Sequence, residues 1–158
     1  MLLGFGWAVI QASRKSYIKA TFDQVFDLDE VMQSRDSSLH VECRAWLEVC
    51  EDPWLKWQFI EHLNNHSGLL QFCTSRNHRT SSIWDLTRFI CEQSDGSYGV
   101  LYIWDDEDLG ERAGQNYASS YRVWRILDGQ LTEHNDSLFT PLVSPNAFGD
   151  DIRFHQEE

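Results

Sequence analysis

The feature that most constrains this chain is the segment Gly96–Asp108, which reads GSYGVLYIWDDED. Its first part follows a glycine-broken turn and is rich in aromatic and branched side chains, which favours a half-buried β-strand. Its last four residues all carry carboxylates, and an unpaired carboxylate is too costly to bury. The segment therefore predicts a strand that ends in an exposed acidic group, which consists of Asp105, Asp106, Glu107 and Asp108.

Length and charge narrow the classes of partner. The 158 residues can bury one core, so we expect a single domain over residues 1–158. The net charge is −12, and such a field repels nucleic-acid phosphates and anionic lipid while it accelerates encounters with basic partners. We therefore expect no direct binding to nucleic acid and none to membranes. These properties leave the oligomeric state open.

The N-terminal segment and the cysteines bear on the compartment. Residues 1–10 are apolar, but they lack a positively charged start and lead into polar residues. They therefore predict neither a secretory signal nor a membrane span. The four cysteines form no C-x-x-C pair and lie within apolar patterns, which favours reduced, packed thiols. Both features predict a cytoplasmic protein.

Six segments have the composition of β-strands. Two pairs of them are joined by hairpin signals, one an Asn/Gly-containing connection at 64–68. The other is the dipeptide Asp128-Gly129, which favours a two-residue turn with positive φ. The predicted strands are residues 5–12, 56–63, 69–74, 98–104, 120–127 and 130–134.

Apolar residues at helical spacing predict two or three helices. One begins near Ser82, where Asp85 completes a variant of the capping box. Residues 39–50 fit either a helix or a strand, and the helix is favoured because it also buries Trp46. A further helix is expected from about Asp27. The predicted fold class is α+β, with a mostly antiparallel sheet of about six strands packed against two or three helices.

A second acidic block lies between Asp23 and Asp52, where nine acidic residues accompany two arginines. The plain interpretation is the solvated face of a helix, and the alternative is a docking surface for a basic partner. The candidate partner-binding residues in this block are Asp27, Asp29, Glu30 and Glu42.

The sequence contains no complete catalytic or metal-binding motif. Asp105–Asp108 offers the oxygen ligands that Mg²⁺ or Ca²⁺ takes, but adjacent side chains on a strand point to opposite faces. His62 and His66 have the spacing of a zinc helix, yet they flank a predicted hairpin. The sequence has no G-x-S-x-G and no Gly-rich phosphate loop. We therefore expect no metal and no cofactor.

His78 stands between Asn77 and Arg79, where the third predicted strand leads into the helix near Ser82. It is either a general base or a buried cap at this junction. The cap is favoured because the first amides of a helix need hydrogen-bond acceptors.

The seven tryptophans are many for a chain of this length. Most are expected in the core, where aromatic side chains bury a large area. One or two near the acidic group are candidate interface residues, since tryptophan is enriched at binding hot spots.

A set of short motifs occurs along most of the chain. They are Gly6-Trp7-Ala8, Asn77-His78-Arg79, Gly96–Tyr102 with Asp105–Asp108, Asn116 with Tyr121–Trp124, Asp128–Leu131, and Asp136–Pro141. In these motifs and their order the chain resembles the immunity protein family seven of bacterial polymorphic toxin systems. Residues 20–60 match the family poorly, so this segment is a candidate for the choice of toxin.

The resemblance implies an α+β, non-enzymatic, cytoplasmic protein that binds and neutralises a cognate toxin domain. The family pairs with several toxin chemistries, so the resemblance does not name the target. The positions that it marks as a structural motif are Asn77, His78, Arg79, Gly96, Tyr98 and Gly99.

Two main hypotheses follow. In the first, the protein is an immunity protein whose acidic surface occludes a basic active-site cleft of the toxin, and the partner-binding residues are Asp105, Asp106, Glu107 and Asp108 together with acids of the segment 23–52. In the second, it is a small metal-dependent hydrolase that uses the Asp105–Asp108 carboxylates with His78. A third hypothesis is a ligand-binding module that uses exposed tryptophans.

Overall fold

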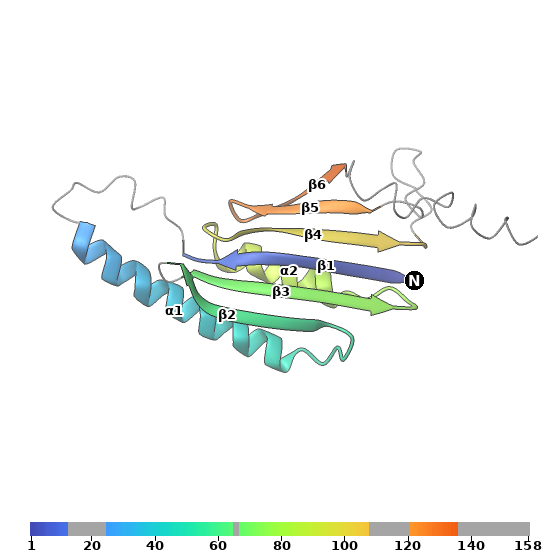
Figure 1. Ribbon diagram of the computed structural model, residues 1–158, viewed down its shortest axis with the longest axis horizontal. Helices are drawn as coiled ribbons and strands as arrows, with labels where there is room; N and C mark the ends of the chain where they lie inside the picture. Colours follow the sequence, from blue (N-terminus) through green and yellow to red (C-terminus); the bar gives the residue numbers. More distant parts are fainter. Residues whose placement is uncertain (13–24, 65–66, 108–120, 136–158) are drawn as a thin grey trace, which may run out of the picture.

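A computed structural model of the protein describes residues 1–12, 25–64, 67–107 and 121–135 (Figure 1). The predicted α+β class is confirmed, and the described residues form a sheet and two helices. The elements are β1 (Leu2–Ile10), α1 (Val25–Val49), β2 (Lys56–Asn64), β3 (Ser67–Arg76), α2 (Ser82–Gln93), β4 (Tyr98–Asp105), β5 (Arg122–Leu127) and β6 (Gln130–Asn135).

The strands form one antiparallel, six-stranded sheet in the order β2-β3-β1-β4-β5-β6. β1 lies in the middle, where Leu2 pairs with Arg76 of β3 on one side and with Asp105 of β4 on the other. The two predicted hairpins form the β2–β3 and β5–β6 pairs. The turn at Asp128 and Gly129 has φ values of 52° and 68°, which confirms the predicted positive-φ dipeptide.

Both helices pack on the same face of the sheet (Figure 1). Their side chains meet in one core, in which Trp46 of α1 stacks on Phe89 of α2 with ring centroids 5.5 Å apart. Successive side chains of a strand point to opposite faces. The alternate residues of each strand therefore face away from the helices, and none of the described helices covers that second face. The core includes Leu2, Ala8, Ile10, Cys43, Leu47, Leu70, Leu101, Ile103, Ile126, Ile83, Leu86 and Ile90.

α1 is a single helix of 25 residues, so the strand alternative for residues 39–50 is wrong. Cys43 and Leu47 lie one turn apart and are both buried in the core. Val41 and Val49 would share their face in a strand, yet both are exposed. The buried residues therefore follow the spacing of a helix and not the alternation expected of a strand.

Two buried polar residues of α1 hold the end of β1. The Asp36 carboxylate is fully buried and accepts the backbone N–H of Ala12 at 2.5 Å. One turn later, Nε2 of buried His40 lies 3.2 Å from the carbonyl oxygen of Ile10. The block between Asp23 and Asp52 is thus not uniformly solvated, because Asp36 points inward to satisfy backbone at the end of the sheet.

α2 confirms the predicted helix near Ser82, but the predicted capping box is wrong. The N-cap residue is Ser81, whose side chain makes no cap hydrogen bond. The side chains of Thr80 and Ser82 donate instead to Asp52, at 2.8 and 2.6 Å. The predicted loop at 109–116 and the tail after Pro141 lie outside the described residues. No described helix is long and apolar enough to cross a membrane.

Candidate functional site

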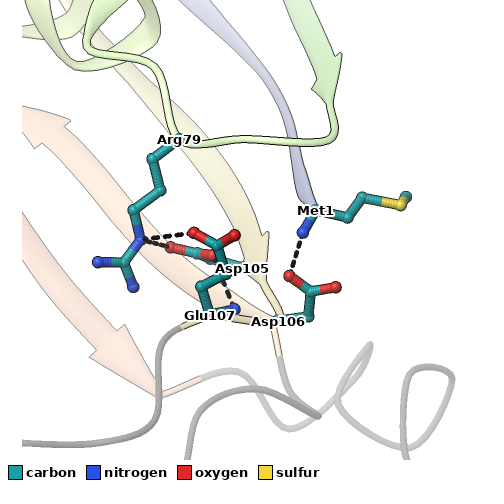
Figure 2. Close-up of polar contacts among 5 residues, drawn as sticks. All are labelled: Met1, Arg79, Asp105, Asp106 and Glu107. Carbon is teal, nitrogen blue, oxygen red and sulfur yellow. Dashed lines mark hydrogen bonds and ion pairs between the residues drawn. The ribbon is translucent and has the colours of Figure 1, made fainter.

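The acidic group at the end of β4 is only partly exposed, contrary to the prediction. Asp105 retains 8% of its accessible surface. Its carboxylate accepts a hydrogen bond from Arg79 Nε at 2.7 Å and one from the backbone N–H of Glu107 at 3.0 Å (Figure 2). A buried carboxylate is tolerated when it is paired and hydrogen-bonded. Arg79 makes this burial possible.

The next two acids lie at the surface beside the same cluster. The Asp106 carboxylate forms an ion pair with the Met1 ammonium group, and its backbone N–H donates to the Met1 carbonyl at 3.2 Å (Figure 2). The carboxylate of Glu107 lies 3.9 Å from Arg79 Nε. Asp108 lies outside the described residues. The three described acids therefore connect the beginning of β1, the end of β4 and the segment before α2.

The candidate acids of the second block belong to α1. Glu30 and Glu42 are exposed on this helix. Asp27 and Asp29 occupy its first turns, where negative charge is favourable near the helix dipole, and their side chains lie outside the description. Exposed Glu48 extends the acidic character toward the end of the helix.

The structure does not bring the two acidic groups together. The start of α1 and the end of β4 lie at opposite ends of the molecule along its longest axis (Figure 1). One flat partner surface would have to cross the whole molecule to contact Glu30 and Asp106 at once. The α1 acids and the β4-end acids are therefore two separate candidate surfaces.

Asn77, His78 and Arg79 form an exposed connection between β3 and α2. The prediction of His78 as a buried cap is wrong, since His78 is exposed and α2 begins at the hydroxyl network around Asp52. Arg79 is the member of this motif with a defined partner, and its side chain is 55% exposed while it holds Asp105.

Gly96, Tyr98 and Gly99 surround the start of β4. The Gly96 carbonyl accepts from Gln11 Nε2 at 2.9 Å. A Cβ at Gly99 would lie 2.7 Å from the Cα of Ala8, so the close approach of β4 to β1 requires glycine there. Tyr98 is 41% exposed and meets the Trp7 ring edge to face, with centroids 6.3 Å apart.

A family model described as Immunity protein 7 matches residues 58–147, which is more than half of the chain. The chain belongs to the immunity protein 7 family. No curated protein and no solved structure matches it.

As a member of the immunity protein 7 family, the chain is an immunity protein of toxin systems. Membership indicates a non-enzymatic inhibitor and implies that it binds a cognate toxin. The match begins within β2, so α1 lies outside the matched segment. This agrees with the poor resemblance of residues 20–60 in the sequence.

The geometry gives little support to a hydrolase in this immunity protein. Among the described residues, no three His, Cys, Asp or Glu side chains are grouped so as to hold a metal ion. Asp105, one carboxylate of that hypothesis, is occupied by Arg79. Burial raises the pKa of the Cys43 thiol to about 12, so it is a poor nucleophile. All four cysteines are free, but Cys73 is exposed rather than packed.

Sequence reasoning missed one surface of the immunity protein, the sheet face opposite the helices. Most tryptophans were expected in the core, but Trp7 is 41% exposed on β1. Phe5, its neighbour on the same face, stacks on Tyr102 of β4 with centroids 5.0 Å apart. The signal was present in β1 and β4, where large side chains occupy the outward as well as the inward positions of the alternation.

Proposed function

We propose that this immunity protein neutralises its cognate toxin domain by occluding a basic cleft of the toxin with the acidic surface of α1. We also propose that the chain acts as a single domain, that it acts in the cytoplasm, and that it needs no cofactor. The observation that carries it is the position of exposed Glu30, Glu42 and Glu48 on the helix that lies outside the matched family segment. Because the family pairs with several toxin chemistries, we expect the contact that selects the toxin to lie in the segment that the family model does not match.

Electrostatics favours α1 over the end of β4 for this contact. The Asp105 carboxylate is buried and held by Arg79, and Asp106 is paired with the Met1 ammonium group. A paired carboxylate contributes less to the attraction of a distant cation than a free one. The α1 carboxylates, added to a net charge of −12, would speed the encounter with a basic toxin by steering.

The test compares two double variants with the same change in charge. Glu30→Lys with Glu42→Lys alters α1, and Asp106→Lys with Glu107→Lys alters the end of β4. The probe is the toxin domain encoded by the neighbouring reading frame, in an inactivated form. We expect the α1 variant to associate more slowly, by about tenfold, and to lose most of its salt dependence, because steering acts on the association rate.

The β4-end variant is the matched control, for which a smaller change in association rate is expected. Equal effects of the two variants would contradict the assignment to α1 and leave only a general effect of net charge. A wild-type protein that neither co-purifies with that toxin domain nor protects cells from it would overturn the proposed function as a whole.

A further inference from the structure

Two buried polar side chains on α1, Asp36 and His40, are not explained by the acidic surface of this helix. Asp36 is 0% exposed and His40 is 4% exposed, although both groups can carry a charge. A carboxylate or an imidazole is more costly to bury than an apolar side chain unless hydrogen bonds compensate it. Their burial therefore indicates a role that an apolar side chain could not fill.

Both side chains bind backbone groups at the end of β1. The Asp36 carboxylate accepts the N–H of Ala12 at 2.5 Å, and His40 Nε2 lies 3.2 Å from the carbonyl oxygen of Ile10. A carbonyl oxygen only accepts hydrogen bonds, so His40 Nε2 donates here. Hydrogen bonds depend on angle, whereas apolar burial has no preferred direction. The two contacts therefore fix the rotation of α1 about its own axis relative to β1.

The site of the His40 ring is closely fitted. The ring meets Phe59 of β2 edge to face, with centroids 5.3 Å apart. A Cβ at Gly68 of β3 would lie 2.9 Å from His40 Nε2, so glycine at this position leaves room for the imidazole. A change in the orientation of α1 would displace the ring from this site.

The two halves of α1 are held by different contacts. Among the described residues, the side chains that α1 contributes to the apolar core or packs against it come from position 39 onward, and they are Leu39, Cys43, Trp46, Leu47 and Cys50. The first turns of α1 extend beyond the ends of the strands (Figure 1). Met32 is buried in the first half, residues 25–35, but it does not belong to that core. Asp36 and His40 therefore hold the helix at the boundary where the described core no longer does.

The helix is also weaker at this boundary. Residues 34–38 read Ser-Arg-Asp-Ser-Ser, and Ser and Asp are poorer helix formers than Ala or Leu. The Ser37 and Ser38 hydroxyls donate to the carbonyl oxygens of Gln33 and Ser34 at 2.9 and 3.0 Å, a contact that often bends helices. Without the contacts of Asp36 and His40, we expect the first half of α1 to tilt at these serines.

We propose that Asp36 and His40 are positioning residues of the toxin-binding surface, which hold the first half of α1 and its exposed Glu30 in the orientation that the toxin meets. The inference rests on the proposed function, since the surface is the same. A binding surface that is already ordered loses less conformational entropy on association. The two residues therefore raise the affinity for the toxin without touching it.

Hydrogen exchange of the free protein tests the positioning. We expect Asp36→Asn and His40→Ala to speed amide exchange in residues 25–35 by about tenfold, as for the loss of one strong hydrogen bond, and to leave residues 43–49 unchanged. His40→Gln should restore most of the protection, because its side-chain amide can donate to the same carbonyl. The control Ile83→Val truncates a buried residue of α2. It should lower the urea midpoint without a selective effect on residues 25–35.

A double-mutant cycle with the inactivated toxin domain tests the binding role. His40→Ala alone should weaken the complex by about fivefold, the cost of ordering the helix on association. The loss of affinity from Glu30→Lys should be smaller when His40→Ala is present, because Glu30 is no longer held in place. The loss from Glu48→Lys, at an exposed position on the half that packs on the core, should be the same in both backgrounds.

A second variant covers a failure of His40→Ala to fold. Asp36→Asn keeps the shape of the side chain and takes the place of His40→Ala in the cycle. Because it also removes a negative charge, Glu51→Gln at an exposed position after α1 is its matched control.

The outcomes separate this inference from the proposed function. Unchanged exchange in residues 25–35, or equal losses from Glu30→Lys in both backgrounds, overturns the inference while the proposed function stands. If the loss from Glu48→Lys shrinks as much as the loss from Glu30→Lys, the variants act by general loss of structure, and the inference is again overturned. If the wild type does not bind the toxin, the proposed function fails, and the positioning role in binding fails with it.

Discussion

Arg79 gives the acidic end of β4 its conformation. Its side chain is more than half exposed, and it therefore retains much of its hydration while it pairs with a carboxylate that is nearly buried. This arrangement costs less than the burial of both charges, because only one ion is fully desolvated. The cluster around Asp105 thus holds three segments of the fold together. Its negative charge therefore does not by itself indicate a partner-binding surface.

Removal of Arg79 should destabilise the fold. Arg79→Ala leaves Asp105 buried without its cation, and the expected loss in the free energy of unfolding is about 1.5 kcal/mol, typical of a hydrogen bond to a charged group. Urea denaturation at neutral pH measures it.

The control is Arg88→Ala, which removes an arginine that pairs with Asp85 in a largely exposed setting. Its expected cost is below about 0.5 kcal/mol. Adding Asp105→Asn to Arg79→Ala should recover part of the loss, since a neutral amide is cheaper to bury. Equal losses for Arg79→Ala and Arg88→Ala would contradict the structural role.

At the scale of elements, Asp52 joins the segment after α1 to the start of α2. Its carboxylate accepts hydrogen bonds from the Ser82 and Thr80 hydroxyls and from the backbone N–H of Trp54, and Arg76 lies 3.5 Å away. Burial opposes ionisation, but these hydrogen bonds outweigh it, and the pKa of Asp52 lies below its usual value. The ionised form therefore stabilises the contact between the two helical segments.

Asp52→Asn should lower the free energy of unfolding near neutral pH, and the loss should shrink in acid. Because the pKa is lower in the folded state, the contribution of Asp52 is complete above its unfolded pKa of about 3.9 and disappears as pH falls through the folded value. Urea titrations at neutral and strongly acidic pH measure both limits. Glu51→Gln, an exposed neighbour, should give nearly the same curve as the wild type; a loss from Asp52→Asn that is independent of pH would contradict the ionic role.

The elements were largely predictable from local sequence, and their contacts were not. The apolar spacing of α2 and the Asp128-Gly129 turn each act within a few residues, so the pattern determines them. The start of α2 depends on Asp52, and Asp105 is buried because of Arg79. Both partners are distant in sequence and meet only in the folded sheet, which no local pattern encodes.

The candidate sites also differ in how far the local sequence predicts them. Exposed Glu30 and Glu42 follow from helical spacing, so the sequence placed them on an acidic helix face. The aromatic contacts on the sheet face opposite the described helices depend on strand order, which brings Trp7 between Gln71 and Val100. This order, with β1 in the centre, is a property of the whole sheet.

At the scale of the molecule, the net charge of −12 acts against the compact state. Repulsion among carboxylates is screened over about 8 Å at physiological ionic strength. We therefore expect the free energy of unfolding to rise when NaCl is increased from a low concentration to about 0.15 M, as measured by urea denaturation at neutral pH. KCl should act equally if screening is the cause, and a fall in stability would mean that surface ion pairs dominate.

The central place of β1 also decides when the fold can form. This strand is synthesised before the other described elements, but its neighbour β3 follows only after α1, and its other neighbour β4 only after α2. Pairings between distant segments form slowly, and an unpaired apolar strand is prone to aggregate meanwhile. During synthesis β1 can therefore pair with β3 before β4 exists, but its second edge stays open until Asp105 has been added. Truncated products that end before β4 will carry an open edge in the middle of the sheet.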